Sequence, residues 1–138
     1  MKTKKRAMKA IGRYLELKGC EILEEGWLHG ADKVDYIVDD EGTVAFVFGR
    51  VSTNSGAGIP DAAIDRKEFE RLAAAYFAEH PELADCAVRA DQASILVISD
   101  SRAIIRHYVN ALGVCGLDLR PQAEAAPPPG GAQAPSPA

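Results

Sequence analysis

Hydrophobic positions recur at two spacings along the chain, and the change of spacing separates expected helices from expected strands. Over residues 4–18 apolar side chains return every three or four positions, which predicts an amphipathic helix with Gly19 as its C-terminal cap. The same spacing returns over residues 61–80, and Pro81 ends that helix. A last helix is expected after a cap at Asp100 or Ser101, with its apolar side chains at Ile104, Ile105, Tyr108 and Leu112.

Between these helices lie short apolar runs bounded by turn residues, a pattern typical of β-strands. The run over residues 44–51 is apolar at almost every position, so we expect a central strand covered on both faces. Residues 39–42, Asp-Asp-Glu-Gly, provide the turn before it. Strands are expected over residues 20–28, 34–38, 44–51, 86–91 and 95–99.

The predicted order is α-β-β-β-α-β-β-α, an α/β domain with a central mixed β-sheet flanked by helices. We assign residues 1–118 to this domain. Residues 119–138 are rich in Pro, Ala and Gly and carry no bulky apolar side chain from Pro121 onward. Such a segment buries too little surface to fold, so a disordered tail is expected.

Composition narrows the possible partners. The 138 residues are 47% hydrophobic, enough for one core, and the net charge of -4 argues against strong non-specific nucleic-acid binding while permitting a local basic patch. Cys20, Cys86 and Cys115 form no Cys-x-x-Cys pair, so neither a metal site nor a disulfide is expected. No signal peptide or membrane span is apparent, which predicts a cytoplasmic protein with no membrane partner.

A basic stripe marks the first predicted helix. Lys2, Arg6, Lys9 and Arg13 are spaced by three and four positions and share one helix face. Two interpretations stay open: a solvated face, or a face that meets phosphate. The sequence favours the first without excluding the second.

Short motifs in a constant order point to a known family. With these motifs the chain resembles the YraN family of uncharacterised bacterial proteins, which look like relatives of the archaeal Holliday-junction resolvases with the restriction-endonuclease-like fold. The matching stretches are residues 14–23 (YLELKGCEIL), 26–27 (GW), 32–37 (DKVDYI), 45–50 (AFVFGR), 58–64 with Lys67, and 107–112 (HYVNAL).

The resemblance implies metal-dependent phosphodiester hydrolysis, with carboxylates holding Mg²⁺ or Mn²⁺ and a lysine meeting the attacking water. In the family pattern position 48 is Glu, position 50 is Lys, and a helix glutamate aligns with position 8. Here Asp35 is kept, but the other positions are Phe48, Arg50 and Met8. One carboxylate does not hold Mg²⁺ in water, so no cofactor is expected unless the site is active, and Phe48 and Met8 are hypothesised to close the old pocket together.

Three functions remain open. The first is a nuclease-like domain with a degenerate metal site that binds DNA weakly and does not cleave it. The second is a protein-interaction module that reuses the fold, and the third is an active metal-dependent endonuclease with a displaced ligand set. We expect Trp27 in the core, His107 at the surface and Asp35 satisfied by Lys33, Arg50 or backbone donors, and the oligomeric state stays open. The predicted phosphate contacts are Lys4, Lys5, Arg6, Lys9, Arg50, Lys67 and Arg71.

Overall fold

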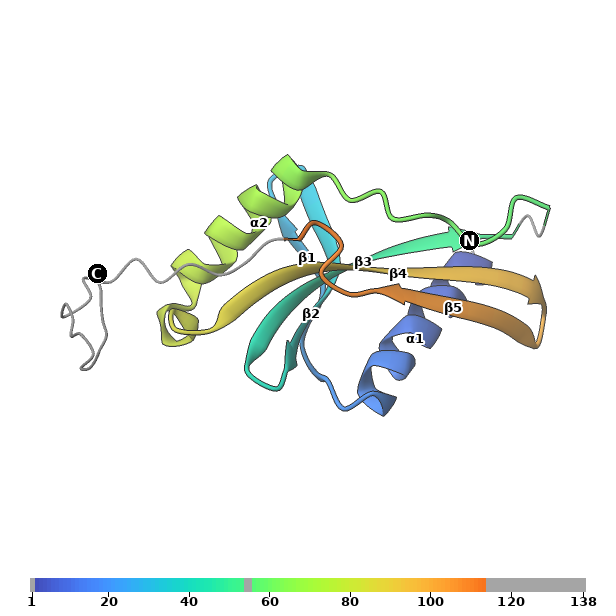
Figure 1. The fold of residues 1–138 in the computed structure, drawn as a ribbon, viewed down its shortest axis with the longest axis horizontal. Helices are drawn as coiled ribbons and strands as arrows, with labels where there is room; N and C mark the ends of the chain where they lie inside the picture. The colour runs from blue at the N-terminus through green and yellow to red at the C-terminus, as the bar shows by residue number, and fades with distance from the viewer. Residues whose placement is uncertain (1, 54–55, 114–138) are drawn as a thin grey trace, which may run out of the picture.

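The computed structural model describes residues 2–53 and 56–113, and within them one five-stranded mixed sheet with the order β1-β2-β3-β4-β5 (Figure 1). The first three strands pair antiparallel, β3 and β4 pair parallel, and β4 and β5 pair antiparallel. The strands are β1 (Glu21–His29), β2 (Asp32–Asp40), β3 (Thr43–Ser52), β4 (Ala87–Ser99) and β5 (Arg102–Tyr108).

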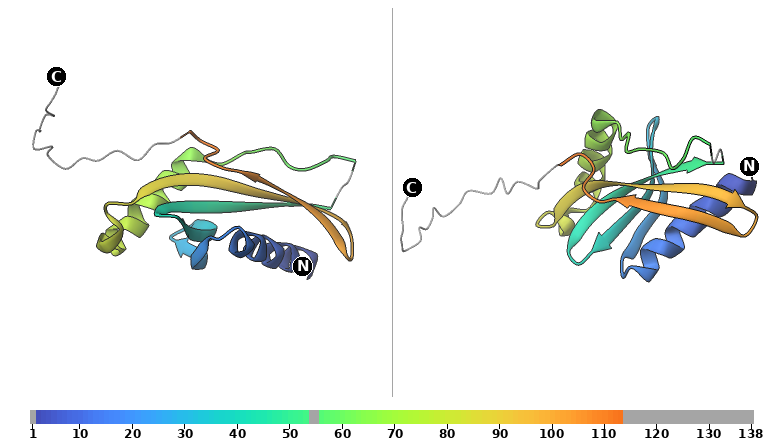
Figure 2. Two further views of the ribbon diagram at one scale, coloured as in Figure 1. Left: turned by 60° about the horizontal axis from the view of Figure 1, so that its bottom comes forward. Right: turned by 45° about the vertical axis from the view of Figure 1, so that its right-hand side comes forward.

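Two helices cover opposite faces of this sheet (Figure 2). Helix α1 (Lys2–Leu17) packs Ile11 and Leu15 onto one face, and α2 (Arg66–Glu79) packs Phe69, Leu72 and Tyr76 onto the other. A short 3-10 helix, η1 (Pro81–Leu83), follows α2. The parallel pairing of β3 with β4 requires a crossover, which the segment containing α2 provides.

Strand β3 is covered on both faces, as its apolar run predicts. Ala45 and Val47 belong to the hydrophobic cluster under α1, whereas Val44 and Phe46 belong to the cluster under α2. All four side chains are buried because successive residues of a strand point to opposite faces. The mixed α/β class and the two main helices are therefore confirmed.

The predicted last helix is wrong, because residues 102–108 form strand β5 at the edge of the sheet. The two strands expected over residues 86–91 and 95–99 are one continuous strand, β4. Apolar residues at 104, 105 and 108 fit a helix face and a strand equally well in so short a run. Residues 102–108 form a strand because they pair with the free backbone edge of β4. The predicted domain end at residue 118 and the tail 119–138 lie outside the described residues.

The second predicted helix starts later than expected. Residues 61–65 are not helical, and the Asp65 carboxylate caps α2 by accepting hydrogen bonds from the backbone N–H groups of Lys67 (3.0 Å) and Glu68 (3.3 Å). At the end of α1, Gly19 takes a φ of 98°, so the predicted glycine cap is confirmed.

A buried carboxylate ties β4, β5 and the β2–β3 turn together. Asp91 is fully buried and accepts hydrogen bonds from Arg89 Nε (3.0 Å) and the Asn110 backbone N–H (2.8 Å). Arg89 also donates to Asp40 at 2.8 Å. Burial raises the pKa of the Asp91 carboxyl, but the hydrogen bonds from His107, Arg89 and Asn110 lower that pKa more, so the net direction is down.

His107 joins this network, contrary to the expectation of a surface residue. Its side chain is 4% exposed, and its Nε2 lies 2.9 Å from Asp91 Oδ2. Its Nδ1 faces Tyr14 Oη (3.1 Å) and Lys18 Nζ (3.2 Å). A carboxylate only accepts and an ammonium only donates, so the hydrogen sits on Nε2. The chain Tyr14–His107–Asp91 therefore fastens α1 to the far edge of the sheet.

Gly12 is required where α1 crosses β2. A Cβ at this position would lie 2.6 Å from Tyr36 Oη, and that hydroxyl donates a hydrogen bond to the Met8 backbone oxygen at 2.8 Å. We predict that Gly12→Ala destabilises the protein by about 1–3 kcal/mol, because overpacking outweighs the gain in helix propensity. Urea unfolding measures this. Combination with Tyr36→Phe, which removes the clashing hydroxyl, should recover part of the loss, and fully additive effects would contradict the clash.

We predict that Asp91→Asn lowers the free energy of unfolding by about 3 kcal/mol, because Arg89 loses its fully buried charge partner and keeps only the more exposed Asp40. Asp40→Asn is the control and should cost much less, since the Asp40 side chain is 29% exposed. The folded pKa of Asp91 lies below its unfolded value near ~3.9, so its contribution is present above that pH and is lost as the pH falls through the folded pKa. Thermal melts from neutral pH to below 4 should show a shallower loss for Asp91→Asn than for the wild type.

Candidate functional site

Strands β2 and β3 separate halfway along β3, and the candidate site lies where they part. Their pairing runs from Asp40 opposite Thr43 to Tyr36 opposite Val47 and stops there. Continuing this register places Asp35 opposite Phe48. Asp35 Oδ2 accepts a hydrogen bond from the Gly49 backbone N–H at 2.7 Å. We call this place the fork and define it by Asp35 of β2 with residues 48–50 of β3.

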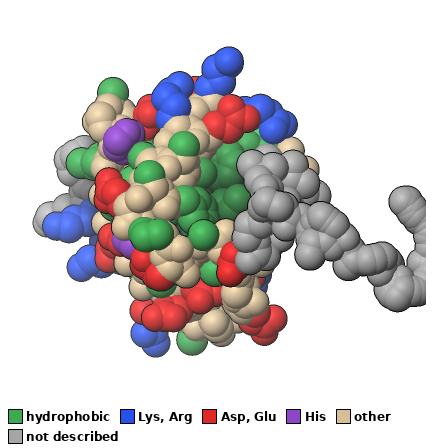
Figure 3. Space-filling model, turned by 90° about the vertical axis from the view of Figure 1, so that its left-hand side faces the viewer, with side chains coloured by type: hydrophobic (Ala, Val, Ile, Leu, Met, Phe, Trp, Pro, Cys, Tyr) green, Lys and Arg blue, Asp and Glu red, His purple; other side chains and the backbone are tan. Residues whose placement is uncertain are grey.

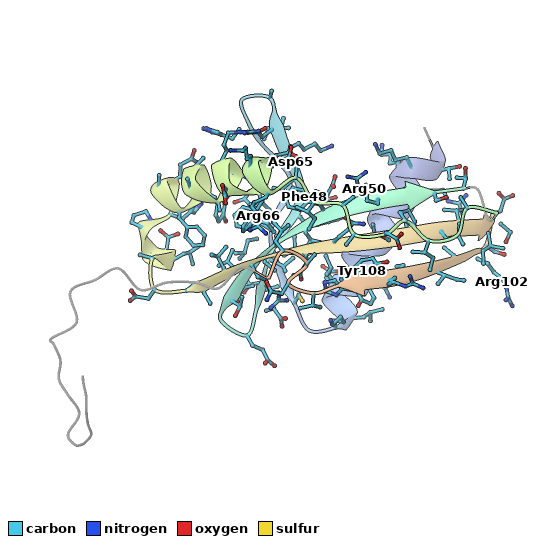
Figure 4. The ribbon with its side chains drawn as sticks, turned by 45° about the horizontal axis from the view of Figure 1, so that its top comes forward. Phe48, Arg50, Asp65, Arg66, Arg102 and Tyr108 are labelled. Carbon is cyan, nitrogen blue, oxygen red and sulfur yellow. The ribbon has the colours of Figure 1, made fainter. Side chains whose placement is uncertain are left out.

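Phe48 and Arg50 point to the same side of β3, as residues two apart on a strand must. Phe48 packs against the hydrophobic cluster under α2. The Arg50 guanidinium donates to the backbone oxygen of Ala63 at 2.7 Å. Figure 4 shows both residues on β3, beside the segment that leads into α2 at Asp65 and Arg66.

Met8 lies on the other face of the sheet. A Cβ built at Gly49 would approach Met8 Sδ and Cε to 2.8 Å, so the thioether sits directly over this glycine. Met8 packs against the cluster under α1, whereas Phe48 packs against the one under α2. The hypothesis that Met8 and Phe48 pack together is therefore wrong, because β3 runs between them. Each fills its own side of the fork.

Residues 60–65 cross the sheet beside Phe48, and a buried glutamine holds them. Gln92 is fully buried and lies opposite Phe48 in the parallel pairing. Its Oε1 accepts from the Ala63 backbone N–H (2.8 Å), and its Nε2 donates to the Asp61 backbone oxygen (2.7 Å) and to Ser94 Oγ (2.9 Å). Sequence analysis missed Gln92. An amide between Ala90 and Ala93, in the strand that leads into an apolar run, was the available signal, since buried amides need partners.

The fork does not fit a magnesium or manganese ion. Asp35 is held by the Gly49 N–H and by Lys33, whose Nζ lies 4.0 Å from Asp35 Oδ1, so the expectation that neighbouring donors satisfy this carboxylate is confirmed. Phe48 offers no oxygen to a cation that prefers several hard oxygen ligands. Among residues 2–53 and 56–113, no group of three His, Cys, Asp or Glu side chains is placed to hold a metal.

Cys20 and Cys86 are free, and burial raises the pKa of the Cys20 thiol.

An open groove of about 540 Å³ lies beside the fork, between the start of α1 and the second half of β3. Lys4 of α1 and Arg50 of β3 bring two cations to it, and both side chains are exposed. The groove exists because β3 continues to Ser52 without β2 beside it. Its lining is Thr3, Lys4, Gly49, Arg50, Val51 and Thr53. We call this surface the fork groove.

The remaining predicted phosphate contacts do not gather at the fork groove. Arg71 makes a bidentate pair with Asp32, with distances of 2.7 and 2.9 Å. Hydrogen bonding from Arg71 lowers the pKa of the Asp32 carboxyl. Lys67 is exposed one turn earlier on α2. Arg6 donates to the Asp100 backbone oxygen at 2.6 Å and, with Lys9, lines a second groove near β5.

The described residues at the far end of the molecule carry charges of both signs. Figure 3 views the end where α2 finishes and shows acidic and basic side chains interspersed around hydrophobic surface. Trp27 packs edge-on against Tyr76 with 5.1 Å between ring centroids and belongs to the periphery of the cluster under α2, as expected of a core residue. In the described part of the chain, no helix has the length and apolarity needed to cross a membrane.

Comparison with known proteins assigns the family. No family model matches the chain. It is 30% identical to a UPF0102 protein of Beutenbergia cavernae over 102 residues, which cover 72% of this chain and 86% of that protein. A UPF0102 protein of Solibacter usitatus is 30% identical over 89 residues, covering 62% of this chain and 67% of that protein. One of Paramagnetospirillum magneticum is 37% identical over 83 residues, covering 56% and 64%. The chain thus belongs to the UPF0102 family, the family of the YraN proteins.

Proposed function

We propose that this protein is a nuclease-like domain with a degenerate metal site that binds nucleic acid through its phosphates and does not cleave it. The observation that supports the proposal most directly is the composition of the fork groove. Two exposed cations, Lys4 and Arg50, line it together, while Phe48 stands where the resemblance to restriction-endonuclease-like enzymes requires a metal-binding carboxylate. The fork groove is lined by positive charge, and the carboxylate that would bind a metal is replaced by Phe48.

The surroundings of the fork groove also favour anions. Helix α1 carries Lys4, Lys5, Arg6 and Lys9 on exposed positions, and its first acidic residue is Glu16. The amino end of a helix adds a partial positive charge. A phosphate in the fork groove would therefore meet Lys4, Arg50 and the positive end of α1. Such contacts read no base sequence, and binding through them weakens steeply with salt.

Cleavage is not part of the proposal, for reasons of charge and geometry. The guanidinium of Arg50 differs in shape from an ammonium group and donates to the Ala63 backbone oxygen, so it does not replace a lysine that orients water. Asp35 is the single carboxylate of the fork, and one of its oxygens is taken by the Gly49 N–H. Without a metal, nothing at the fork lowers the pKa of an attacking water.

The proposal predicts weak, salt-dependent binding of labelled single-stranded, duplex and branched DNA, measured by fluorescence anisotropy. Lys4→Glu with Arg50→Glu should weaken binding by about tenfold or more, since two phosphate contacts become repulsive. Lys67→Glu with Arg102→Glu makes the same change of net charge away from the fork groove and is the control. Absence of binding to any DNA at low salt, or an equal loss in the control, would refute the proposal.

Restoring the missing groups tests whether the metal site is degenerate. Phe48→Glu with Arg50→Lys should give measurable Mn²⁺ binding by calorimetry, because position 48 continues the register that faces Asp35 and a second carboxylate would then border the fork. Addition of Met8→Glu should not strengthen Mn²⁺ binding, since Met8 lies across β3 from Phe48. Thermal melts of each variant show whether the loss of Phe48 packing has unfolded the protein. Mn²⁺-dependent cutting by the wild type on a denaturing gel would overturn the interpretation of Phe48.

A further inference from the structure

Strand β5 ends the sheet with an unpaired edge. Among the described residues it hydrogen-bonds as a strand to β4 alone. Its backbone N–H and C=O groups on the outer side are therefore available to another strand. In Figure 1 the C-terminal half of α1 extends below β5 in that view.

A second groove, also of about 540 Å³, lies where α1 passes β5. We call it the edge groove. Its floor is apolar and is formed by Ala10, Tyr14 and Leu17 of α1 with Ile105 of β5. Leu17 is 76% exposed, the highest value among the large hydrophobic side chains that the structure shows at the surface. An exposed leucine beside a free strand edge marks a surface suited to a partner.

The edge groove carries positive charge and no acid. Arg6, Lys9 and Arg13 line it, and no Asp or Glu does. Lys9 and Arg13 have no ion pair with any described residue, and Arg6 meets only a backbone oxygen. On the opposite face of β5, Arg102, Ile104 and Arg106 alternate along the strand, and Ile104 is 46% exposed. Arg106 donates a hydrogen bond to Tyr108 Oη at 3.3 Å. Both faces of the edge therefore combine apolar surface with cations that form no ion pair with a described residue.

We propose that β5 accepts an extended acidic segment of a partner protein as a sixth strand of the sheet. The segment's alternate apolar side chains lie in the edge groove on Leu17, Tyr14 and Ile105. Its acidic side chains on the other face meet Arg102 and Arg106, and further acids at its ends meet Lys9 and Arg13. Backbone hydrogen bonds to an edge supply affinity, and side-chain alternation supplies specificity.

The edge groove meets β5 at its middle. Ile105 is the residue of β5 in its lining, and the other lining residues belong to α1. Strand β5 has 7 residues, so a segment paired along it would pass over the groove at Ile105.

Charge excludes a second copy of this chain as the favoured occupant. Antiparallel pairing of β5 with its own copy around Ile104 would place Arg102 opposite Arg106 twice. Like charges directly opposite on neighbouring strands are destabilising. An acidic strand turns the same two positions into attractive pairs. The apolar floor of the edge groove likewise favours a peptide over nucleic acid, whose phosphates gain nothing from Leu17 and Ile105.

The test is an anisotropy titration of the full chain into a labelled peptide of about eight residues that alternates glutamate and valine, long enough to pair along β5. Two control peptides separate the contribution of charge from that of backbone hydrogen bonds. One alternates lysine and valine, and the other keeps the acidic sequence but carries N-methyl groups on alternate backbone nitrogens, which removes the hydrogen bonds of an added strand. Binding of the acidic peptide and a loss of about tenfold or more with either control are expected.

Matched variants locate the binding surface. Leu17→Ser and Arg106→Glu should each weaken binding of the acidic peptide by about fivefold or more, because each removes one contact of the proposed strand. Leu28→Ser, at a leucine that is 64% exposed on β1, and Lys67→Glu on α2 are the controls and should change it less than twofold. All four positions are exposed, so these variants should fold, and circular dichroism verifies this.

The outcomes are decisive for the inference and independent of DNA binding. If the N-methylated peptide binds as well as the unmodified one, the segment does not pair with β5 through its backbone. If the Leu28 and Lys67 controls lose as much binding as Leu17→Ser and Arg106→Glu, the peptide does not bind at the edge groove. No binding of the acidic peptide at low salt would overturn the inference as a whole. DNA binding should survive Leu17→Ser, and peptide binding should survive Lys4→Glu with Arg50→Glu, so failure of one proposal does not imply failure of the other.

Discussion

The buried carboxylate of Asp91 holds together the half of the molecule on which both candidate surfaces depend. It receives hydrogen bonds from Arg89, His107 and Asn110, and so joins β4, β5 and the chain that follows β5. Through His107 it also reaches Tyr14, which sets the distance between α1 and the edge of the sheet. A buried charge is tolerated only with such partners. The position of α1 against both the fork and β5 follows from this network.

The fork combines one satisfied carboxylate with hydrophobic packing on both faces of β3. Strands β2 and β3 still part beside Asp35, and the Gly49 N–H now takes up an oxygen of that carboxylate. Phe48 adds to the core under α2, and Met8 covers Gly49 from the other face. The arrangement is satisfied without a ligand. The side chains around it therefore belong to the hydrophobic clusters on both sides of β3.

The positive charge of α1 serves two separate surfaces because a helix presents several faces. Lys4 turns toward β3 and the fork groove, whereas Arg6, Lys9 and Arg13 turn toward β5 and the edge groove. The two grooves differ in what surrounds the charge. The first combines cations with backbone and small polar groups, which suits phosphate, and the second combines them with exposed leucine and isoleucine, which suits a peptide.

Much of the fold followed from local patterning. Both long helices, the glycine cap at Gly19 and the doubly covered strand β3 are marked by spacing and turn chemistry, because these signals act over a few residues. The family motifs likewise placed Asp35 and Phe48 on neighbouring strands, and pairing of the adjacent residues agrees with that placement.

The tertiary structure decided the rest. Residues 102–108 fit a helix as well as a strand until the free edge of β4 paired with them. The roles of His107, Gln92 and Asp91 depend on groups that only folding brings near. Tyr14 lies 93 positions from His107, the backbone N–H of Ala63 lies 29 positions from Gln92, and His107 lies 16 positions from Asp91. Sequence alone determined the periodic elements and the residues at positions 8, 35, 48 and 50, because both depend on single residues and short spacings. Which cations share a groove, and which strand is left without a neighbour, depends on contacts between distant segments, and no local spacing encodes these.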